Sequence, residues 1–473
     1  MQQNLLLSVM GGLLITYLVI GYFVARSLRS SLDYLFAGKT LGIPAITATL
    51  LAAQVGGGMF LGTAENPFHG LLYIFGIVLG LLILGLGLAQ RLRALEVESI
   101  GAIFEKKYGS RVLKNVCDLL SVTAFLGILI AQIVAAKSLL LTFAEIENNF
   151  PFILFWLGVT LYTMIGGFHT IIITDFFRIV FITVIFSGIC IYNLVTTSTP
   201  FFTLQTGKNI YDLFKLSDIT YVSAARIMLV PALFCLIEQD LAQKFFAART
   251  QFIAGISALY ASFLLLIFSF IPFYFGIQSK LLNLFTPINT SPLLPFLQGT
   301  TNTFFFTIAL CALLSAITST TDSLLCAISS ILTKEVATFC KTKPTIFISR
   351  SIILVTGITT LIASFFVSEG IISILIESYE IAICGLLIPF IASLFLKNVS
   401  KKAAWVSVVI GLVSFIFFKL PAILPTSYTF CNPIISTSIF YNPYAIFISL
   451  ALSTISYVFC AFIQRKYNRS RTI

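Results

Sequence analysis

Long apolar runs alternate with short polar connections along almost the whole chain. A helix needs about 20 apolar residues to cross the roughly 30 Å of hydrocarbon in a bilayer, so each long run predicts a membrane span. The runs predict thirteen transmembrane helices, at residues 4–25, 42–66, 70–90, 117–143, 151–168, 175–197, 223–243, 251–277, 303–332, 350–367, 371–396, 403–420 and 443–463. We therefore expect an all-α, polytopic membrane protein.

The composition supports this fold class and excludes others. Of the 473 residues, 58% are hydrophobic and 10% are charged, whereas a soluble domain carries about 25% charge. No polar tract is long enough for a soluble domain of about 100 residues, which excludes kinase and nucleotide-binding domains. The chain is predicted to be a single transmembrane domain in a lipid bilayer.

The basic surplus of the chain predicts its orientation. Lys and Arg number 29 against 18 Asp and Glu, and in a soluble protein such a balance would suggest nucleic acid as a partner. Here most of the cations fall in alternate connections, so the positive-inside rule predicts an outside N-terminus and an inside C-terminus with a cytoplasmic tail at 464–473. We expect no nucleic-acid partner and infer no obligatory protein partner.

A run of three glycines interrupts the second predicted span. Gly56, Gly57 and Gly58 lie in its middle, and each Gly in a helix interior costs about 1 kcal/mol relative to Ala. The run predicts that the helix unwinds there. Unwound backbone is tolerated at membrane depth where it is buried or lines a cavity, since freed carbonyls need partners, and a cation can be that partner. Close helix packing through small residues is the alternative interpretation.

The ninth predicted span, 303–332, carries a dense group of hydroxyl side chains. Ala316, Ser319 and Thr320 stand at i, i+3 and i+4 and so share one helix face. Isolated hydroxyls often bond back to the carbonyl four residues earlier, which is the structural alternative. Six hydroxyls around Asp322 are more than such back-bonding requires, and a small hard cation prefers several oxygen ligands. They are Ser315, Thr318, Ser319, Thr320, Thr321 and Ser323.

Acidic residues inside or beside spans are weaker candidates. Asp175 is expected at the cytoplasmic mouth of span six beside Arg178, where a surface ion pair is the alternative to a transport role. The polar residues of 238–244 are expected to form salt-bridged structure at the same face. Glu377 and Glu380 are one turn apart in span eleven, and acids at that depth are functional candidates.

Six segments together resemble the sodium:solute symporter family, which includes bacterial sodium/proline, sodium/pantothenate, sialic acid and sugar symporters. Each segment is weak alone, but their order and their placement among N-out spans are fairly specific. They are DYLFAGKTLG (33–42), AAQVGGGMFLG (52–62), EKKYGSR (105–111), YTMIGGFHTIIITDFFR (162–178), EQDLAQKFFAAR (238–249) and SAITSTTDSLLCAISSILTKE (315–335).

The resemblance implies a LeuT-like fold built from two inverted five-helix repeats. The repeats would cover 42–197 and 223–396, with an extra helix at 4–25 before them and two more within 403–463 after them. Each repeat would begin with a discontinuous helix. Pro231 is the candidate for the break in the second repeat, because proline removes a helix hydrogen bond.

The resemblance also implies the residues of a sodium site. Two carbonyls would come from the break of the second span, and one carbonyl and two hydroxyls from the ninth. These ligands would be Ala52, Val55, Ala316, Ser319 and Thr320, with Ala53 and Gly56 in place of Ala52 and Val55 if the second span is shifted by one residue. Asp175 matches an acid near the cytoplasmic exit for sodium, which implies a role in ion release.

Residues at the same break are candidates for binding the solute. They are Gln54, Gly56 and Gly57. The sodium/proline pattern has an acid where this chain has Gln54, so the sequence departs there from the relatives that carry proline. Gln54 is polar in an otherwise apolar helix and could reach a substrate from the break.

Together these features predict sodium-driven uptake of a small organic solute by alternating access in a cell membrane of the bacterial inner-membrane type. Sodium would be co-transported, and the solute would be an amino acid, pantothenate or another organic anion. A proton-coupled carrier on the same fold is the alternative, with Asp322, Asp175 or Glu380 as the titrating group. A polytopic membrane enzyme is more remote, since the sequence has no HExxH or GxSxG motif. We expect a protein that is not an enzyme.

Overall fold

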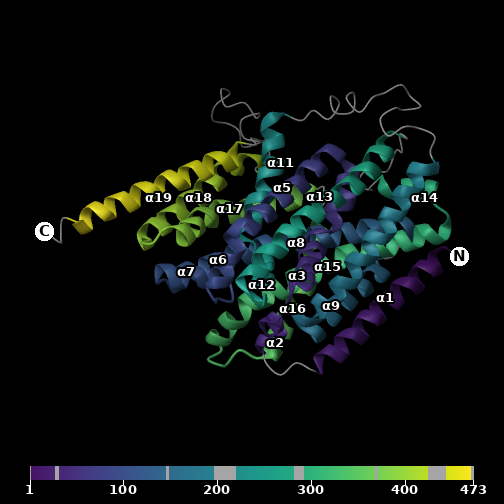
Figure 1. Cartoon of the computed structure of the whole chain (residues 1–473), viewed down its shortest axis with the longest axis horizontal. Coiled ribbons are helices and arrows are strands. Elements are labelled where there is room, and N and C mark those ends of the chain that lie inside the picture. Colours follow the sequence, from purple (N-terminus) through teal and green to yellow (C-terminus); the bar gives the residue numbers. More distant parts are fainter. Residues whose placement is uncertain are drawn as a thin grey trace.

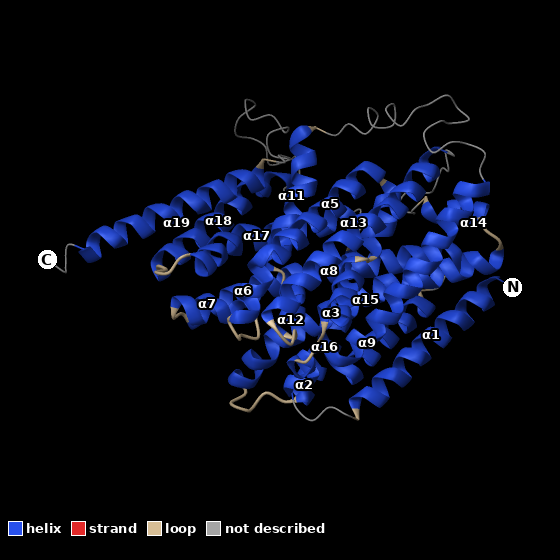
Figure 2. Cartoon of the chain, in the orientation of Figure 1, coloured by secondary structure: helices blue, strands red, loops and turns tan. Residues whose placement is uncertain are grey.

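A computed structural model describes residues 2–26, 31–144, 149–196, 220–281, 292–367, 371–423 and 444–469. Helices dominate these residues and none of them forms a strand (Figure 2). The α-helices are α1 (Gln2–Ala25), α2 (Ser31–Phe36), α3 (Ile43–Gln54), α4 (Thr63–Glu65), α5 (Pro67–Ile83), α6 (Ala89–Ala94), α7 (Ile100–Tyr108), α8 (Arg111–Ala144), α9 (Phe150–Thr196), α11 (Tyr221–Ile237), α12 (Gln239–Phe246), α13 (Gln251–Leu281), α14 (Leu293–Thr300), α15 (Thr303–Phe339), α16 (Ile346–Ala363), α17 (Ile371–Phe395), α18 (Lys401–Ile423) and α19 (Ala445–Arg469). Short 3₁₀ or π-helical turns join some of them: η1 (Ala37–Lys39), η2 (Gly58–Gly62), η3 (Leu84–Leu88) and η4 (Ser364–Phe366). The last four residues of the predicted tail, 470–473, lie outside the described residues.

The prediction of a multi-pass, all-helical membrane protein is confirmed. In the described part of the chain, ten helices are long and apolar enough to span a membrane, and the number rises to twelve when each of two bent helix pairs counts as one span. The predicted number of thirteen is therefore not confirmed as such. The difference lies in α9, which covers both of the spans predicted between 151 and 197.

A kink at Gly167 divides α9 into two helices. The element has 47 residues, which at 1.5 Å per residue is about 70 Å, more than twice the thickness of the hydrocarbon core. Gly167 has φ of 63° and ψ of −163°, a conformation that a residue with a Cβ rarely adopts. A Cβ there would also lie 2.6 Å from ring atoms of Tyr34 on α2. The hydropathy profile detected the two halves, and the glycine turn joins them.

Two spans are sharply bent. α3 meets the segment from η2 to α4 at an angle of 51°, and α11 meets α12 at 42°. The break in the first pair falls at the glycine run, as predicted. The expectation that Pro231 breaks the second was wrong: Pro231 lies inside α11, and the chain bends at Glu238, whose φ of −74° and ψ of 114° are non-helical. The Pro231 ring instead packs against Gly76 of α5, where a Cβ would come within 2.7 Å of it.

The bent pairs lie in the middle of the bundle. α3 packs against α9, α13 and α15, while α12 contacts both α3 and α15. Among the ten unbroken candidate spans of the described residues, α15 is the most enclosed, with 78% of its apolar window buried, against 17% for α1 and 22% for α19. Figure 1 shows α1 along the outside of α9 and the pair of α18 and α19 at the opposite end. The bent helices therefore meet in the protein interior, away from the lipid-facing helices.

Candidate functional site

The break in α3 removes the normal helix partners of two carbonyls. In a continuous helix the N–H of Gly56 would bind the carbonyl of Ala52, and that of Gly57 would bind Ala53. Instead the Gly56 N–H donates to the carbonyl of Gln54 at 3.1 Å, and the Gly57 N–H donates to a side-chain oxygen on α8 at 3.0 Å. The carbonyls of Ala52 and Ala53 are thus available to groups outside their own helix.

Two hydroxyls of α15 bind these two carbonyls in place of the missing helix amides. Ser319 Oγ lies 2.7 Å from the Ala52 carbonyl oxygen, and Thr320 Oγ1 lies 2.9 Å from that of Ala53. The same hydroxyls lie 2.8 and 3.5 Å from the carbonyl of Ala316. Five uncharged oxygens from two helices therefore gather in a buried place, and a small hard cation takes such ligands when the hydroxyls turn their lone pairs toward it. We call these five groups the oxygen cluster.

These contacts bear on the two alternative pairs of sodium ligands in the second predicted span, Ala52 with Val55 or, shifted by one residue, Ala53 with Gly56. Ala52 belongs to the first pair and Ala53 to the shifted pair, and the structure brings the carbonyls of both to hydroxyls of α15. The Met59 N–H, which would bind the Val55 carbonyl in a regular helix, donates instead to the Gly56 carbonyl at 3.1 Å. Val55 therefore lies at the bend with its carbonyl outside the helical pattern, while the Gly56 carbonyl has an amide partner.

Each glycine of the run faces a different helix. A Cβ on Gly56 would lie 2.6 Å from Thr320 Oγ1 of α15, one on Gly57 would lie 2.6 Å from an alanine Cβ of α8, and one on Gly58 would lie 2.5 Å from a leucine side chain of α17. Close packing was the alternative to unwinding, and the structure has both. The absence of side chains lets three helices approach the unwound backbone.

A small cavity lies beside the oxygen cluster, between the two bends. Its volume of about 20 Å³ is room for about one water molecule. The described lining includes Gln54 at the first bend, Glu238 at the second, Gln132 of α8, Tyr379 of α17 and Thr320. Because Thr320 belongs to both the cavity wall and the oxygen cluster, anything bound in the cavity would adjoin an ion bound in the cluster.

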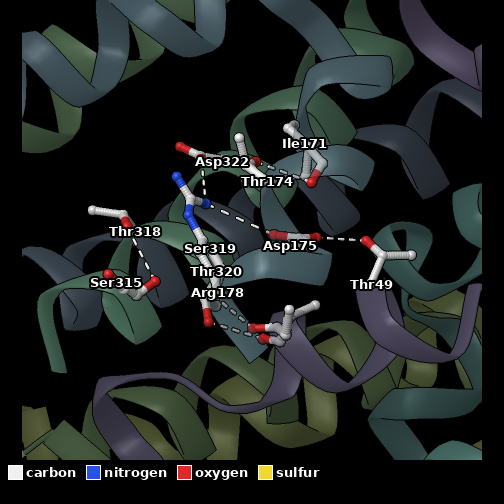
Figure 3. A network of polar contacts seen from close by, with 12 residues as sticks. Thr49, Ile171, Thr174, Asp175, Arg178, Ser315, Thr318, Ser319, Thr320 and Asp322 are labelled. Carbon is white, nitrogen blue, oxygen red and sulfur yellow. Dashed lines mark hydrogen bonds and ion pairs between the residues drawn. The ribbon is translucent and has the colours of Figure 1, made fainter. Parts of the chain in front are cut away.

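A buried ion-pair network adjoins the cluster. Arg178 Nη1 lies 2.7 Å from Asp322 Oδ2 and 3.7 Å from Asp175 Oδ1. Figure 3 draws both contacts as dashed lines. The guanidinium carbon lies 4.2 Å from the centre of the Tyr17 ring. Asp175 Oδ2 accepts a hydrogen bond of 2.6 Å from Thr49, one turn before the freed carbonyls of α3. Asp322, only two residues after Thr320, connects this network to the cluster through α15.

Two further hydroxyls surround the Asp322 carboxylate. Thr163 Oγ1 donates to its Oδ1 at 2.7 Å, and the Tyr162 hydroxyl donates to its Oδ2. Arg178 and both aspartates are at most 1% exposed. Hydrogen bonds and an opposite charge thus compensate the cost of burying Asp322.

Comparison with known proteins places this arrangement in a family. A sequence model of the sodium:solute symporter family matches residues 34–411. The chain belongs to the sodium:solute symporter family. This symporter-family chain is 26% identical over 177 residues to the sodium/pantothenate symporter of Escherichia coli (strain K12). That alignment covers 34% of this chain and spans only 37% of the relative's length.

Solved structures of related transporters share the fold. A Na⁺-coupled sialic acid symporter in a substrate-bound outward-open state superposes with a TM-score of 0.74 at 17% identity, covering 96% of this chain and 97% of the other. A nucleobase-cation-symport-1 family transporter in a closed conformation, with bromovinylhydantoin bound, gives 0.58 at 13% identity, covering 91% and 95%. The expected LeuT-like fold is confirmed, and the family and these neighbours are transporters rather than enzymes.

Two expectations about acids in this family member were wrong. Asp175 is fully buried, because α9 packs against α3 and α15, so its pair with Arg178 is not the surface ion pair given as the alternative. Glu238 was grouped with salt-bridged structure, but it lines the central cavity and receives a hydrogen bond of 3.4 Å from Gln54 Nε2. Only Asp240 and Lys244 of that group form the expected pair, at 2.5 Å.

The sequence reading also missed Gln132, whose Oε1 accepts the Gly57 N–H. Its only signal was an amide side chain in a long apolar helix.

The acids of span eleven have other partners: Glu380 is paired with Arg226 at 2.5 Å, and Glu377, half exposed, with Lys419 at 2.8 Å. A transport role for Glu377 or Glu380 stays a prediction.

Proposed function

We propose that this chain is a symporter that couples sodium entry to the uptake of a small organic solute by alternating access. The single observation that carries the proposal is the oxygen cluster, formed where the broken helix of a sodium:solute symporter-family chain meets α15. At a membrane potential of about 100 mV, one sodium charge supplies about 2.3 kcal/mol before any concentration gradient is counted. No covalent chemistry is needed.

The proposed sodium ligands are the carbonyls of Ala52, Ala53 and Ala316 and the hydroxyls of Ser319 and Thr320. The Val55 carbonyl, implied by the family resemblance, is the further candidate at the bend. A site of uncharged oxygens binds sodium weakly enough to release it, which a transport cycle requires. The ion would tie α3 to α15 and favour the outward-open state.

The solute is proposed to bind in the cavity between the bends, next to Gln54 and Gly56, which line it. Gly57, the third candidate, does not line the cavity and lies between two glycines that do. A cavity of about 20 Å³ holds no organic molecule, so the helices around it must separate before a solute enters. Inward opening would then release the solute and the ion. Asp175, linked through Thr49 to α3 one turn from the cluster, is the proposed residue of ion release.

A proton-coupled carrier on the same fold is the second candidate, favoured by the carboxylate of Glu238 in the cavity wall. Uptake into proteoliposomes separates the two candidates. We expect an inward sodium gradient at equal pH on both sides to drive solute accumulation, and a proton gradient without sodium to drive none. The reverse pattern would contradict the sodium proposal.

A further inference from the structure

The centre of the protein holds more buried negative charge than positive charge. Four carboxylates lie around the two bends and the neighbouring part of α9 and α15: Asp175, Glu238, Asp240 and Asp322. Two buried cations face them, Arg178 and Lys244. Burying a charge without a partner is costly. One bound sodium ion would remove part of this excess and leave one formal negative charge uncompensated.

The uncompensated charge can be assigned to one residue. Arg178 forms ion pairs with both Asp175 and Asp322, and Lys244 pairs with Asp240 at 2.5 Å. Among the described residues, no cation lies within ion-pairing distance of Glu238, which is 7% exposed and accepts only the long hydrogen bond of 3.4 Å from Gln54. Glu238 therefore presents a carboxylate to the central cavity.

The rest of the cavity wall offers no positive charge. The other described lining residues are amides, hydroxyls, an acid that is already paired, and apolar groups, with no Lys, Arg or His among them. A solute whose only charge is negative would bring that charge next to the Glu238 carboxylate, and like charges repel strongly where water is excluded. A protonated nitrogen would instead complete the missing ion pair.

We infer that the transported solute carries a protonated amine or another cationic nitrogen, and that Glu238 is the residue that binds it. The inference rests on the proposed function, since it concerns the solute of that transport cycle. It excludes pantothenate and other amine-free organic anions, and it retains amino acids and other amines. The Glu238 side chain and the solute nitrogen would form a charge-assisted hydrogen bond across the second bend.

The solute can be identified without guessing it in advance. Purified protein is reconstituted into potassium-loaded proteoliposomes and diluted into sodium buffer with a defined mixture of amino acids, aliphatic amines, sugars, hydroxy acids and pantothenate. Mass spectrometry then identifies what accumulates with sodium but not with potassium outside. We expect the accumulated solutes to carry a basic nitrogen, and their hydroxyl analogues to compete at least about tenfold more weakly.

Variants of Glu238 test its role directly. Glu238→Gln keeps the shape and removes the charge, so the apparent affinity for the imported amine should fall at least about tenfold. Glu238→Asp keeps the charge and should lose less. Glu105→Gln is the matched control, because Glu105 is an exposed acid on α7 and does not line the cavity. A sodium-dependent rise in melting temperature verifies that each variant is folded.

The outcomes separate this inference from the function on which it rests. Sodium-driven accumulation of a solute without a basic nitrogen, or an unchanged amine affinity in folded Glu238→Gln, would overturn the inference and leave symport standing. If Glu238→Gln does not fold, the solute mixture and Glu238→Asp still decide. Accumulation of no solute on the sodium gradient would overturn the proposed symport and this inference together.

Discussion

Ser319 Oγ lies 2.7 Å from the carbonyl oxygen of Ala52, and the two residues are 267 positions apart in the chain. The contact joins the first helix of one proposed repeat to a helix of the other. It exists because the Gly56 amide, the regular partner of that carbonyl, turns to Gln54 instead. A cation that inserted here would bind both helices at once.

Removing the two hydroxyls should weaken sodium binding. In Ser319→Ala and Thr320→Val each loss of a ligand is expected to raise the sodium concentration for half-maximal uptake about tenfold, or about 1.4 kcal/mol. Thr321→Val is the control, because the Thr321 hydroxyl bonds to the Ile317 carbonyl of its own helix at 2.9 Å. Sodium titrations of uptake check this, and the same sodium requirement in all three variants would reject the cluster as the ion site.

Exchanging sodium for potassium should lower the thermal stability of the purified protein. A ligand that binds only the folded state stabilises it by an amount that grows with its concentration. At a sodium concentration about 100 times the dissociation constant the gain is about 2.7 kcal/mol. Melting curves in matched sodium and potassium buffers measure the effect. In Ser319→Ala the difference between the two buffers should shrink, and a full difference there would argue that sodium binds elsewhere.

A side chain on the middle glycine should destabilise the fold. In Gly57→Ala the new Cβ would lie 2.6 Å from the Cβ of Ala135 on α8, and overpacking of this kind costs about 1–3 kcal/mol. Adding Ala135→Gly makes room for the methyl group and should restore much of the lost stability. Melting temperatures of the single and double variants provide the measurement. If the second substitution restores nothing, the glycine has a role other than close helix approach.

The buried pair of Arg178 and Asp322 should matter more for stability than an exposed pair. Asp322→Asn leaves the guanidinium with a weaker partner, and breaking a buried ion pair costs about 3–5 kcal/mol. Glu377→Gln removes a half-exposed pair and should cost about 1 kcal/mol or less. Denaturation of both variants in the same detergent allows the comparison. Equal losses would mean that the Arg178 network contributes no more than a surface contact.

Much of this architecture follows from local sequence. Hydropathy located the spans, and the cost of glycine in helices located the break beside Ala52. Helical spacing put Ser319 and Thr320 on one face of α15. The sequence could not show the partners of that face, because pairing across 267 residues depends on how whole helices pack.

The missed features share a physical cause. Pro231 is a strong local signal for a helix break, yet its ring fits the surface left free by Gly76, and the bend falls at Glu238 instead. Glu238 resembled its ion-paired neighbours in sequence, but the bend turns it toward the cavity. Gln132 is a single amide whose partner lies on another helix. In each case tertiary packing determines the outcome.

The Gln132 side chain supplies a substitute acceptor for the backbone of α3. Its oxygen accepts a hydrogen bond of 3.0 Å from the Gly57 N–H. Straightening α3 into a continuous helix would therefore leave a buried acceptor on α8 without a donor. The open turn is thus stabilised by a neighbouring helix of the protein itself. In the proposed symport, sodium would act mainly on the distance between α3 and α15, since a protein side chain already satisfies part of the interrupted backbone.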